Sequence, residues 1–195
     1  NKDLDSSLIF FQFSEKWCEP YLDQNWGIYE SKMKIYLDLG EVEKISSLNH
    51  KIIHLNIGNI FQLKYYDLLK RIGHFLSHKK YYFEEALLSY KKAYDYYEEH
   101  FDSFNKKLKG IDYFFWWRNP AYLLDSIGEI NYEIGNNEEA IEYLHNSIEI
   151  TQMFIEMFEG ELNADQTKRI DISFSKTYYL LAAIMFENDG NANEL

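Results

Sequence analysis

Apolar residues recur every three or four positions along almost the whole chain, and this spacing constrains the fold more than any other feature. Ile127, Ile130 and Ile134 show the pattern, which continues in Ile141 and Leu144. In an α-helix such residues lie on one face, which packs against a neighbouring helix. The 195 residues include only 2 prolines and 9 glycines, too few for a protein of many short strands and turns. The sequence therefore predicts an all-α fold.

Short interruptions rich in glycine and asparagine divide this pattern into about eight predicted helices. The expected spans are 3–18, 21–39, 41–56, 59–79, 83–109, 112–135, 137–160 and 165–188. Short connections make consecutive helices antiparallel, so we expect helix pairs. Pro120 lies inside the sixth span, and the helix either bends there or begins at Asn119 with the proline in its first turn. The second arrangement, with a separate helical turn over Phe114–Arg118, is preferred.

The composition indicates one folded, acidic domain. Hydrophobic residues make up 46% of the chain, enough to bury the core of an ordinary domain, so we expect a single domain over 1–195. The 20 basic and 32 acidic residues give a formal net charge of −12. This charge repels nucleic acid and favours a basic protein or peptide as partner. The alternative, that the charge only keeps the domain soluble, stays open.

Cysteine content and hydropathy indicate the cellular compartment in which the protein is expected. Cys18 is the only cysteine, so no disulfide can form within the chain and no paired cysteines can bind zinc. The longest apolar runs, such as Leu8–Phe11 and Tyr178–Phe186, are too short to cross a bilayer. We expect a cytoplasmic protein without a membrane anchor. Because the chain begins at Asn1 and not at methionine, a removed signal peptide or upstream domain stays open as an alternative.

One segment, Leu123–Ile150, carries small and apolar residues at fixed offsets. Gly128, Ala140 and Ser147 stand where two antiparallel helices press together, and Gly135 lies in the turn between them. Small residues allow the close approach, and larger ones fill the gaps alongside. In this pattern the segment resembles the tetratricopeptide repeat. The resemblance implies an α-solenoid in which antiparallel helix pairs stack as a right-handed superhelix.

Weaker copies of the pattern recur at a long step. Ala86 precedes Ala140 by 54 residues, and Gly190 follows Gly135 by 55. The standard repeat has about 34 residues, so this step implies a variant with longer helices. The sequence also departs from the family at Asn131, where an aromatic residue is usual. The resemblance is strongest over Leu123–Ile150.

The resemblance also implies a binding site. Proteins with this repeat bind extended peptides or partner helices in a concave groove lined by the first helix of each pair. The matching positions here are mainly acidic and aromatic, a lining suited to a basic segment. They are Tyr122, Asp125, Glu129, Tyr132 and Glu133 in the best repeat, and Glu30, Lys34, Asp38, Asp67, Lys70, His74, His78 and Glu187 in the weaker ones. The alternative is an ordinary solvated face.

An aromatic run over Tyr113–Arg118 is the most unusual local feature. It places five aromatic residues next to a cation, and consecutive helical residues cannot all face one way. Trp116 and Trp117, together with Arg118, are therefore candidates for an exposed anchor. Burial between neighbouring helices is the preferred alternative.

No catalytic residue, metal or cofactor is expected. His50 and His54 stand four apart, as do His74 and His78, a spacing that two metal ligands on one helix face need. Neither pair carries the glutamate of a metalloprotease motif, and no glycine-rich phosphate loop or nucleophile elbow occurs. We therefore expect a protein that is not an enzyme.

The leading hypothesis is a non-catalytic adaptor that holds a basic protein or peptide segment in an acidic, aromatic groove. One alternative is a small acidic immunity protein that blocks a basic toxin. Another is the peptide-sensing half of a bacterial regulator. The sequence does not predict an oligomeric state.

Overall fold

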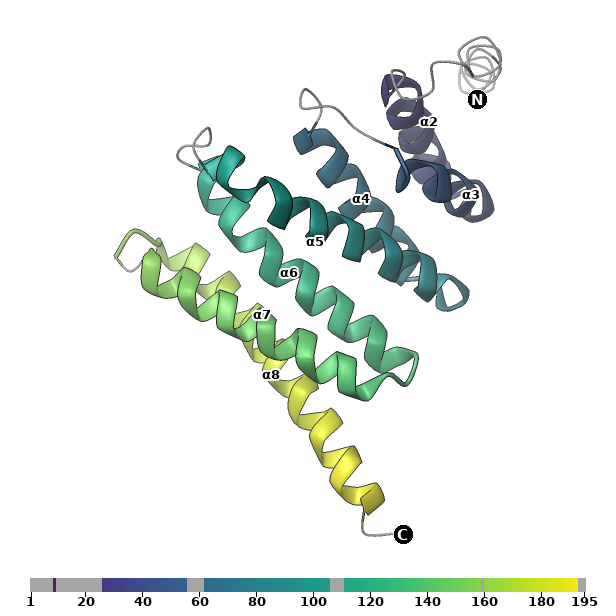
Figure 1. Cartoon of the computed structure of the whole chain (residues 1–195). Coiled ribbons are helices and arrows are strands. Elements are labelled where there is room, and N and C mark those ends of the chain that lie inside the picture. Colours follow the sequence, from purple (N-terminus) through teal and green to yellow (C-terminus); the bar gives the residue numbers. More distant parts are fainter. Residues whose placement is uncertain (1–8, 10–25, 56–61, 106–110, 159, 193–195) are drawn as a thin grey trace. The chain divides into compact units, whose positions relative to one another are not determined.

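The computed structural model describes residues 9, 26–55, 62–105, 111–158 and 160–192. Within these residues the chain is helical and has no strand, which confirms the predicted all-α class. The elements are α2 (Trp26–Leu39), α3 (Val42–Ile52), α4 (Gln62–Ser77), the short 3-10 helix η2 (Lys80–Tyr82), α5 (Phe83–Asn105), α6 (Ile111–Glu133), α7 (Asn137–Met157) and α8 (Ala164–Ala192) (Figure 1). The predicted helix over 3–18 falls almost wholly outside the described residues. None of the described helices has the length and apolar character needed to cross a membrane.

The preferred arrangement around Pro120 was wrong. Helix α6 is continuous from Ile111 to Glu133 with Pro120 inside it, instead of beginning anew at Asn119 after a separate turn. A proline within a helix removes one backbone hydrogen bond. Pro120 and Ala121 are both buried, and this packing offsets the lost bond.

Two other helix ends differ from the prediction. Helix α3 ends at Ile52, short of the expected 56, and α8 continues to Ala192, beyond the expected 188. Gly190 therefore lies within α8, where a glycine costs about 1 kcal/mol relative to alanine and does not by itself end a helix.

The chain divides into two compact units, residues 1–93 and 94–195, with the boundary inside α5. In the first unit, α2, α3 and α4 contact one another and bury Met33, Ile45 and Ile72. The side chain of Asn49, fully buried on α3, donates a 2.7 Å hydrogen bond to the hydroxyl of Ser89 on α5. The bond joins two helices in the core of this unit.

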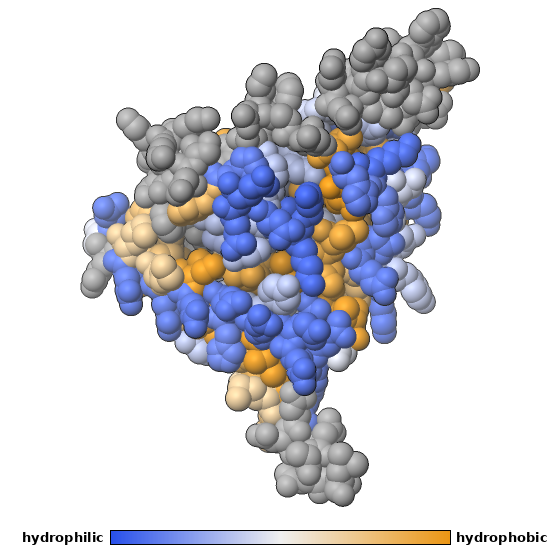
Figure 2. Space-filling view, viewed as in Figure 1, coloured by the Kyte–Doolittle hydropathy of each residue, from blue (hydrophilic) through white to orange (hydrophobic). Residues whose placement is uncertain are grey.

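In the second unit, α7 packs against both α6 and α8 (Figure 1). Ala140, Leu144 and Ile148 of α7 form a core cluster with Leu181 and Ile184 of α8. Polar residues cover much of the outer surface, with apolar residues between them, on the face drawn in Figure 2. The predicted amphipathic pattern thus places apolar side chains between these helices.

The same close approach between helices occurs in both units. A Cβ added at Gly73 would lie 2.9 Å from the Tyr90 ring, and one added at Gly128 would lie 2.7 Å from Leu144 Cγ. The two glycines are 55 residues apart, and Tyr90 and Leu144 are 54 apart. The spacing of these contacts matches the step found in the sequence.

Local residues explain where α6 ends and where α8 begins. Gly135 adopts φ 86° after α6, a conformation that favours glycine, and Asn136 N–H returns to the Asn131 carbonyl at 2.8 Å. At the start of α8, Asn163 and Gln166 exchange backbone-to-side-chain hydrogen bonds, each 2.9 Å long. This reciprocal pair satisfies two amides at the helix start.

Candidate functional site

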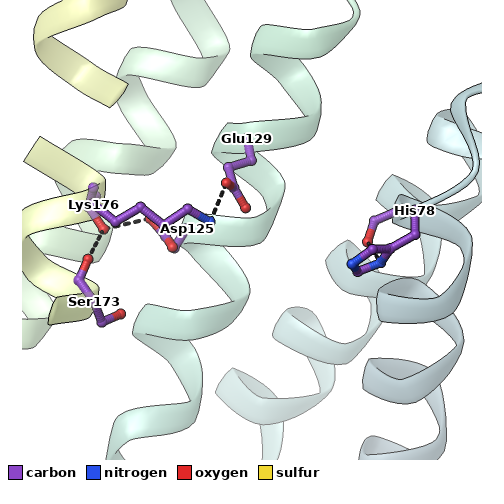
Figure 3. A network of polar contacts seen from close by, with 7 residues as sticks. His78, Asp125, Glu129, Ser173 and Lys176 are labelled. Carbon is purple, nitrogen blue, oxygen red and sulfur yellow. Dashed lines mark hydrogen bonds and ion pairs between the residues drawn. The ribbon is translucent and has the colours of Figure 1, made fainter. Parts of the chain in front are cut away.

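Side chains of α6 that the sequence singled out are linked to α8 (Figure 3). Lys176 of α8 places its Nζ 2.5 Å from Oε1 of Glu129 on α6. The Thr177 hydroxyl donates a 2.6 Å hydrogen bond to Oδ1 of Asp125 and also lies 3.1 Å from the Ser173 carbonyl oxygen. Asp125 and Glu129 are four residues apart, so they share one side of α6.

A third link joins the same two helices near their ends. The Tyr132 hydroxyl contacts both carboxylate oxygens of Glu187, at 3.0 Å and 3.1 Å. The two residues are 55 positions apart, the step at which the sequence pattern repeats. We call the surface formed by Tyr122, Asp125, Glu129, Tyr132, Glu133, Lys176 and Glu187 the acidic face.

The surroundings change the protonation of groups on this face. Burial raises the pKa of Asp125 above its ordinary value, and the nearby charge of Glu129 adds to this, although the Thr177 hydrogen bond opposes it. Burial lowers the pKa of Lys176, but the hydrogen bond and charge of Glu129 outweigh burial, so its pKa is raised. The bond to Glu187 raises the pKa of the Tyr132 hydroxyl.

The acidic face keeps an excess of negative charge despite the lysine. It holds the four carboxyl groups of Asp125, Glu129, Glu133 and Glu187 and the single ammonium of Lys176, a formal balance of −3. Glu129, Glu187 and Glu133 are all at least partly exposed. Tyr122 is 38% exposed, so an aromatic surface adjoins the carboxylates. This combination can bind guanidinium and ammonium groups.

In the first unit, Glu30 of α2 and Asp67 of α4 line one open cleft of about 300 Å³. Its other lining residues are Lys34, Leu63, Lys64, Leu68 and Arg71. We call this the α2–α4 cleft. Three cations and two carboxylates surround it, so its lining differs from the acidic groove expected from the sequence.

The remaining predicted positions of the first unit lie outside that lining. Asp38 is exposed near the end of α2, and Lys70 Nζ lies 5.6 Å from the centre of the Tyr66 ring. The rings of His74 and His78 stand edge to face at 4.7 Å. Burial, and to a smaller extent the neighbouring His78, lower the pKa of His74.

The predicted aromatic anchor falls outside the described side chains. Trp116, Trp117 and Arg118 belong to α6, but their side chains lie outside the described part of the structure, so the aromatic anchor stays a prediction. His50 lies on α3, whereas His54 follows the helix end, so this pair does not share a helix face. Among the described side chains, no three histidine, cysteine, aspartate or glutamate residues are grouped to hold a metal ion.

The sequence interpretation missed an exposed apolar row on α8. Ile172, Tyr179 and Phe186 are 61%, 78% and 80% exposed. They occur every seventh residue, a spacing that keeps side chains on one side of a helix. That spacing was the available signal. Apolar side chains aligned in this way are typical of interaction surfaces.

Comparison with known proteins adds no family assignment. The chain matches no protein-family model, and no curated protein shows significant similarity to it. Its function is therefore inferred from the described surfaces.

Proposed function

We propose that this protein is a non-catalytic scaffold whose stacked helix pairs form a tetratricopeptide-like solenoid and hold a basic segment of a partner protein or peptide. The segment binds along the acidic face of α6 and α8. The observation that supports this most directly is the excess of three negative charges around Glu129 and Lys176. Electrostatic complementarity of this kind selects partners and accelerates their association.

The links between α6 and α8 prepare the face for binding. Asp125, Glu129 and Tyr132 each contact α8, so their side chains are already ordered. Ordering side chains before a ligand arrives lowers the entropy cost of association. The carboxylates also have further lone pairs, which lets them accept hydrogen bonds from arginine or lysine.

The Thr177 contact resembles a nucleophile held by a base, since its hydroxyl donates to the Asp125 carboxylate at 2.6 Å. Thr177 is only 4% exposed, however, and a nucleophile must reach a substrate. The contact instead joins α8 to α6. This supports a binding role for the acidic face over a catalytic one.

The proposal is tested with a fluorescent peptide rich in arginine and lysine, titrated by anisotropy at low and high salt. Combining Glu129→Lys with Tyr132→Ala reverses one charge and removes one aromatic contact, so binding should weaken by at least about tenfold. A matched control combines Glu142→Lys on α7 with Tyr81→Ala, since both residues are exposed and lie outside the acidic face. Circular dichroism checks that both variants keep their helicity. Equal affinity of the two folded variants would refute the acidic face as the binding site.

A further inference from the structure

The α2–α4 cleft differs from the acidic face in its charge, because three cations and two carboxylates line it. Glu30 Oε1 lies 2.6 Å from Lys34 Nζ, and Asp67 Oδ1 lies 3.8 Å from Lys70 Nζ. Both carboxylates of the cleft therefore have a cation beside them.

The two other cations of the cleft form no ion pair with any residue that the structure describes. These cations, Lys64 and Arg71, are both exposed. Both line the cleft. An ammonium and a guanidinium group are thus available to a negatively charged ligand.

The positions of Lys64 and Arg71 set the distance between the two negative groups of that ligand. They are seven residues apart on α4, two helical turns, which corresponds to about 10 Å along the axis. A peptide in the polyproline II conformation rises about 3.1 Å per residue and has three residues per turn. Two carboxylates three positions apart on such a peptide therefore lie on one side, about 9 Å apart, and match the two cations. The planar guanidinium of Arg71 can bind one carboxylate through two parallel hydrogen bonds.

An apolar contact accompanies the charges. Leu63 lines the cleft and is 42% exposed, whereas Leu68, also in the lining, is buried. Leu63 directly precedes Lys64 on α4, so an apolar side chain beside the acidic residue bound by Lys64 can pack against it. This contact excludes water beside the charged groups and strengthens their hydrogen bonds.

We propose that the α2–α4 cleft binds an acidic peptide segment, with two carboxylates three residues apart on Lys64 and Arg71 and an apolar side chain on Leu63. The site is separate from the acidic face and does not rest on the function proposed for it. The protein then has binding surfaces for both signs of charge. A long nucleic acid is disfavoured because the chain carries a formal net charge of −12.

The experiment titrates the protein with a labelled peptide of the pattern Glu-Leu-X-Glu within a neutral, extended sequence. Lys64→Glu with Arg71→Glu should weaken binding by at least about tenfold, since both charge-assisted contacts become repulsions. Asp67→Asn should tighten binding, since Asp67 lies between the two cations on the same helix. Replacing both glutamates of the peptide with glutamine should abolish binding.

A matched control separates the cleft from general charge effects. Lys79→Glu with Lys80→Glu makes the same change in charge at exposed positions outside the cleft, and it should leave affinity unchanged. Equal weakening by this control, or unchanged binding by the folded variant with Lys64→Glu and Arg71→Glu, would overturn the proposal. A single-stranded oligonucleotide that displaces the peptide at lower concentration would also overturn it, by showing that the cleft prefers phosphate.

The titration with the acidic peptide tests the α2–α4 cleft independently of the acidic face. Glu129→Lys changes the second unit and should not alter affinity for the acidic peptide. Loss of basic-peptide binding with retained acidic-peptide binding would identify the two sites separately. Failure of one titration alone would overturn only its own proposal.

Discussion

Lys176 on α8 and Glu129 on α6 form an ion pair across two helices, with 2.5 Å between Nζ and Oε1. The side chains are 60% and 39% exposed, and exposed pairs of this kind contribute at most about 1 kcal/mol to stability. The pair has a larger effect on the local charge, because Lys176 is the only cation assigned to the acidic face.

Replacing Lys176 with glutamine should therefore strengthen the binding of a basic peptide. The change leaves Glu129 available and makes the acidic face more negative, so the affinity should rise and depend more steeply on salt. Titrations at two salt concentrations measure this. Chemical denaturation should show a loss of no more than about 1 kcal/mol. If the folded variant bound the basic peptide more weakly, the assignment of Lys176 to the acidic face would be contradicted.

Asp125 should make stability depend on pH. Its pKa in the folded protein lies above the ordinary value of 3.8, chiefly because of burial. The folded state then binds the proton more tightly than the unfolded chain, so ionisation of Asp125 lowers stability as pH rises from 3.8 through the raised pKa. Asp125→Asn removes this titration, and its amide oxygen can still accept the Thr177 hydrogen bond. Urea unfolding of both proteins from about pH 4 to 7 should show wild type losing stability relative to the variant. Parallel curves would contradict the prediction.

Gly128→Ala should destabilise the second unit. The new Cβ would lie 2.7 Å from Leu144 Cγ and 3.3 Å from the Ala140 carbonyl oxygen. Overpacking costs about 1–3 kcal/mol, and the gain of about 1 kcal/mol in helix propensity offsets part of it. Thermal and urea unfolding should show a net loss.

Gly27→Ala is the matched control for this substitution. Gly27 is also helical, but among the described residues no atom outside its own stretch of helix lies within 4 Å of its added Cβ. Stability should rise by about 0.5 kcal/mol, because alanine reduces the conformational entropy of the unfolded chain. A similar gain at Gly128 would show that α6 and α7 do not approach as closely as described.

Asn163→Ala should lower stability by about 1 kcal/mol, since it removes the side chain that caps α8. Asn163 Oδ1 accepts the Gln166 amide at 2.9 Å. Asn146→Ala, at an exposed position within α7, is the control and should be neutral or stabilising. Urea unfolding of both variants gives the comparison. Equal effects would contradict a capping role for Asn163.

Local chemistry explains which parts of the fold the sequence could predict. Helix α7 begins at Asn137 as expected, because the preceding Gly135 adopts a positive φ that few other residues tolerate. The continuation of α6 through Pro120 depends instead on the burial of Pro120 and Ala121. Local propensity does not include that packing.

The candidate site was predictable only in part. The resemblance to the tetratricopeptide repeat implied Asp125, Glu129, Tyr132 and Glu187, but Lys176 and Thr177 were not identified. Their partners are 47 and 52 residues away in sequence, and no local pattern indicates such contacts. Lys64 and Arg71 were also missed, because the groove offsets selected Asp67 and Lys70 on the same helix.

The apolar row on α8 implies a second effect of salt, opposite to the one expected at the acidic face. Added salt would screen the attraction between the acidic face and a basic peptide, and so weaken the proposed complex. The same screening reduces the repulsion between molecules with a formal net charge of −12, while Ile172, Tyr179 and Phe186 remain exposed. If copies of the protein associate through this row, their association should increase at the salt concentrations that weaken the proposed peptide complex.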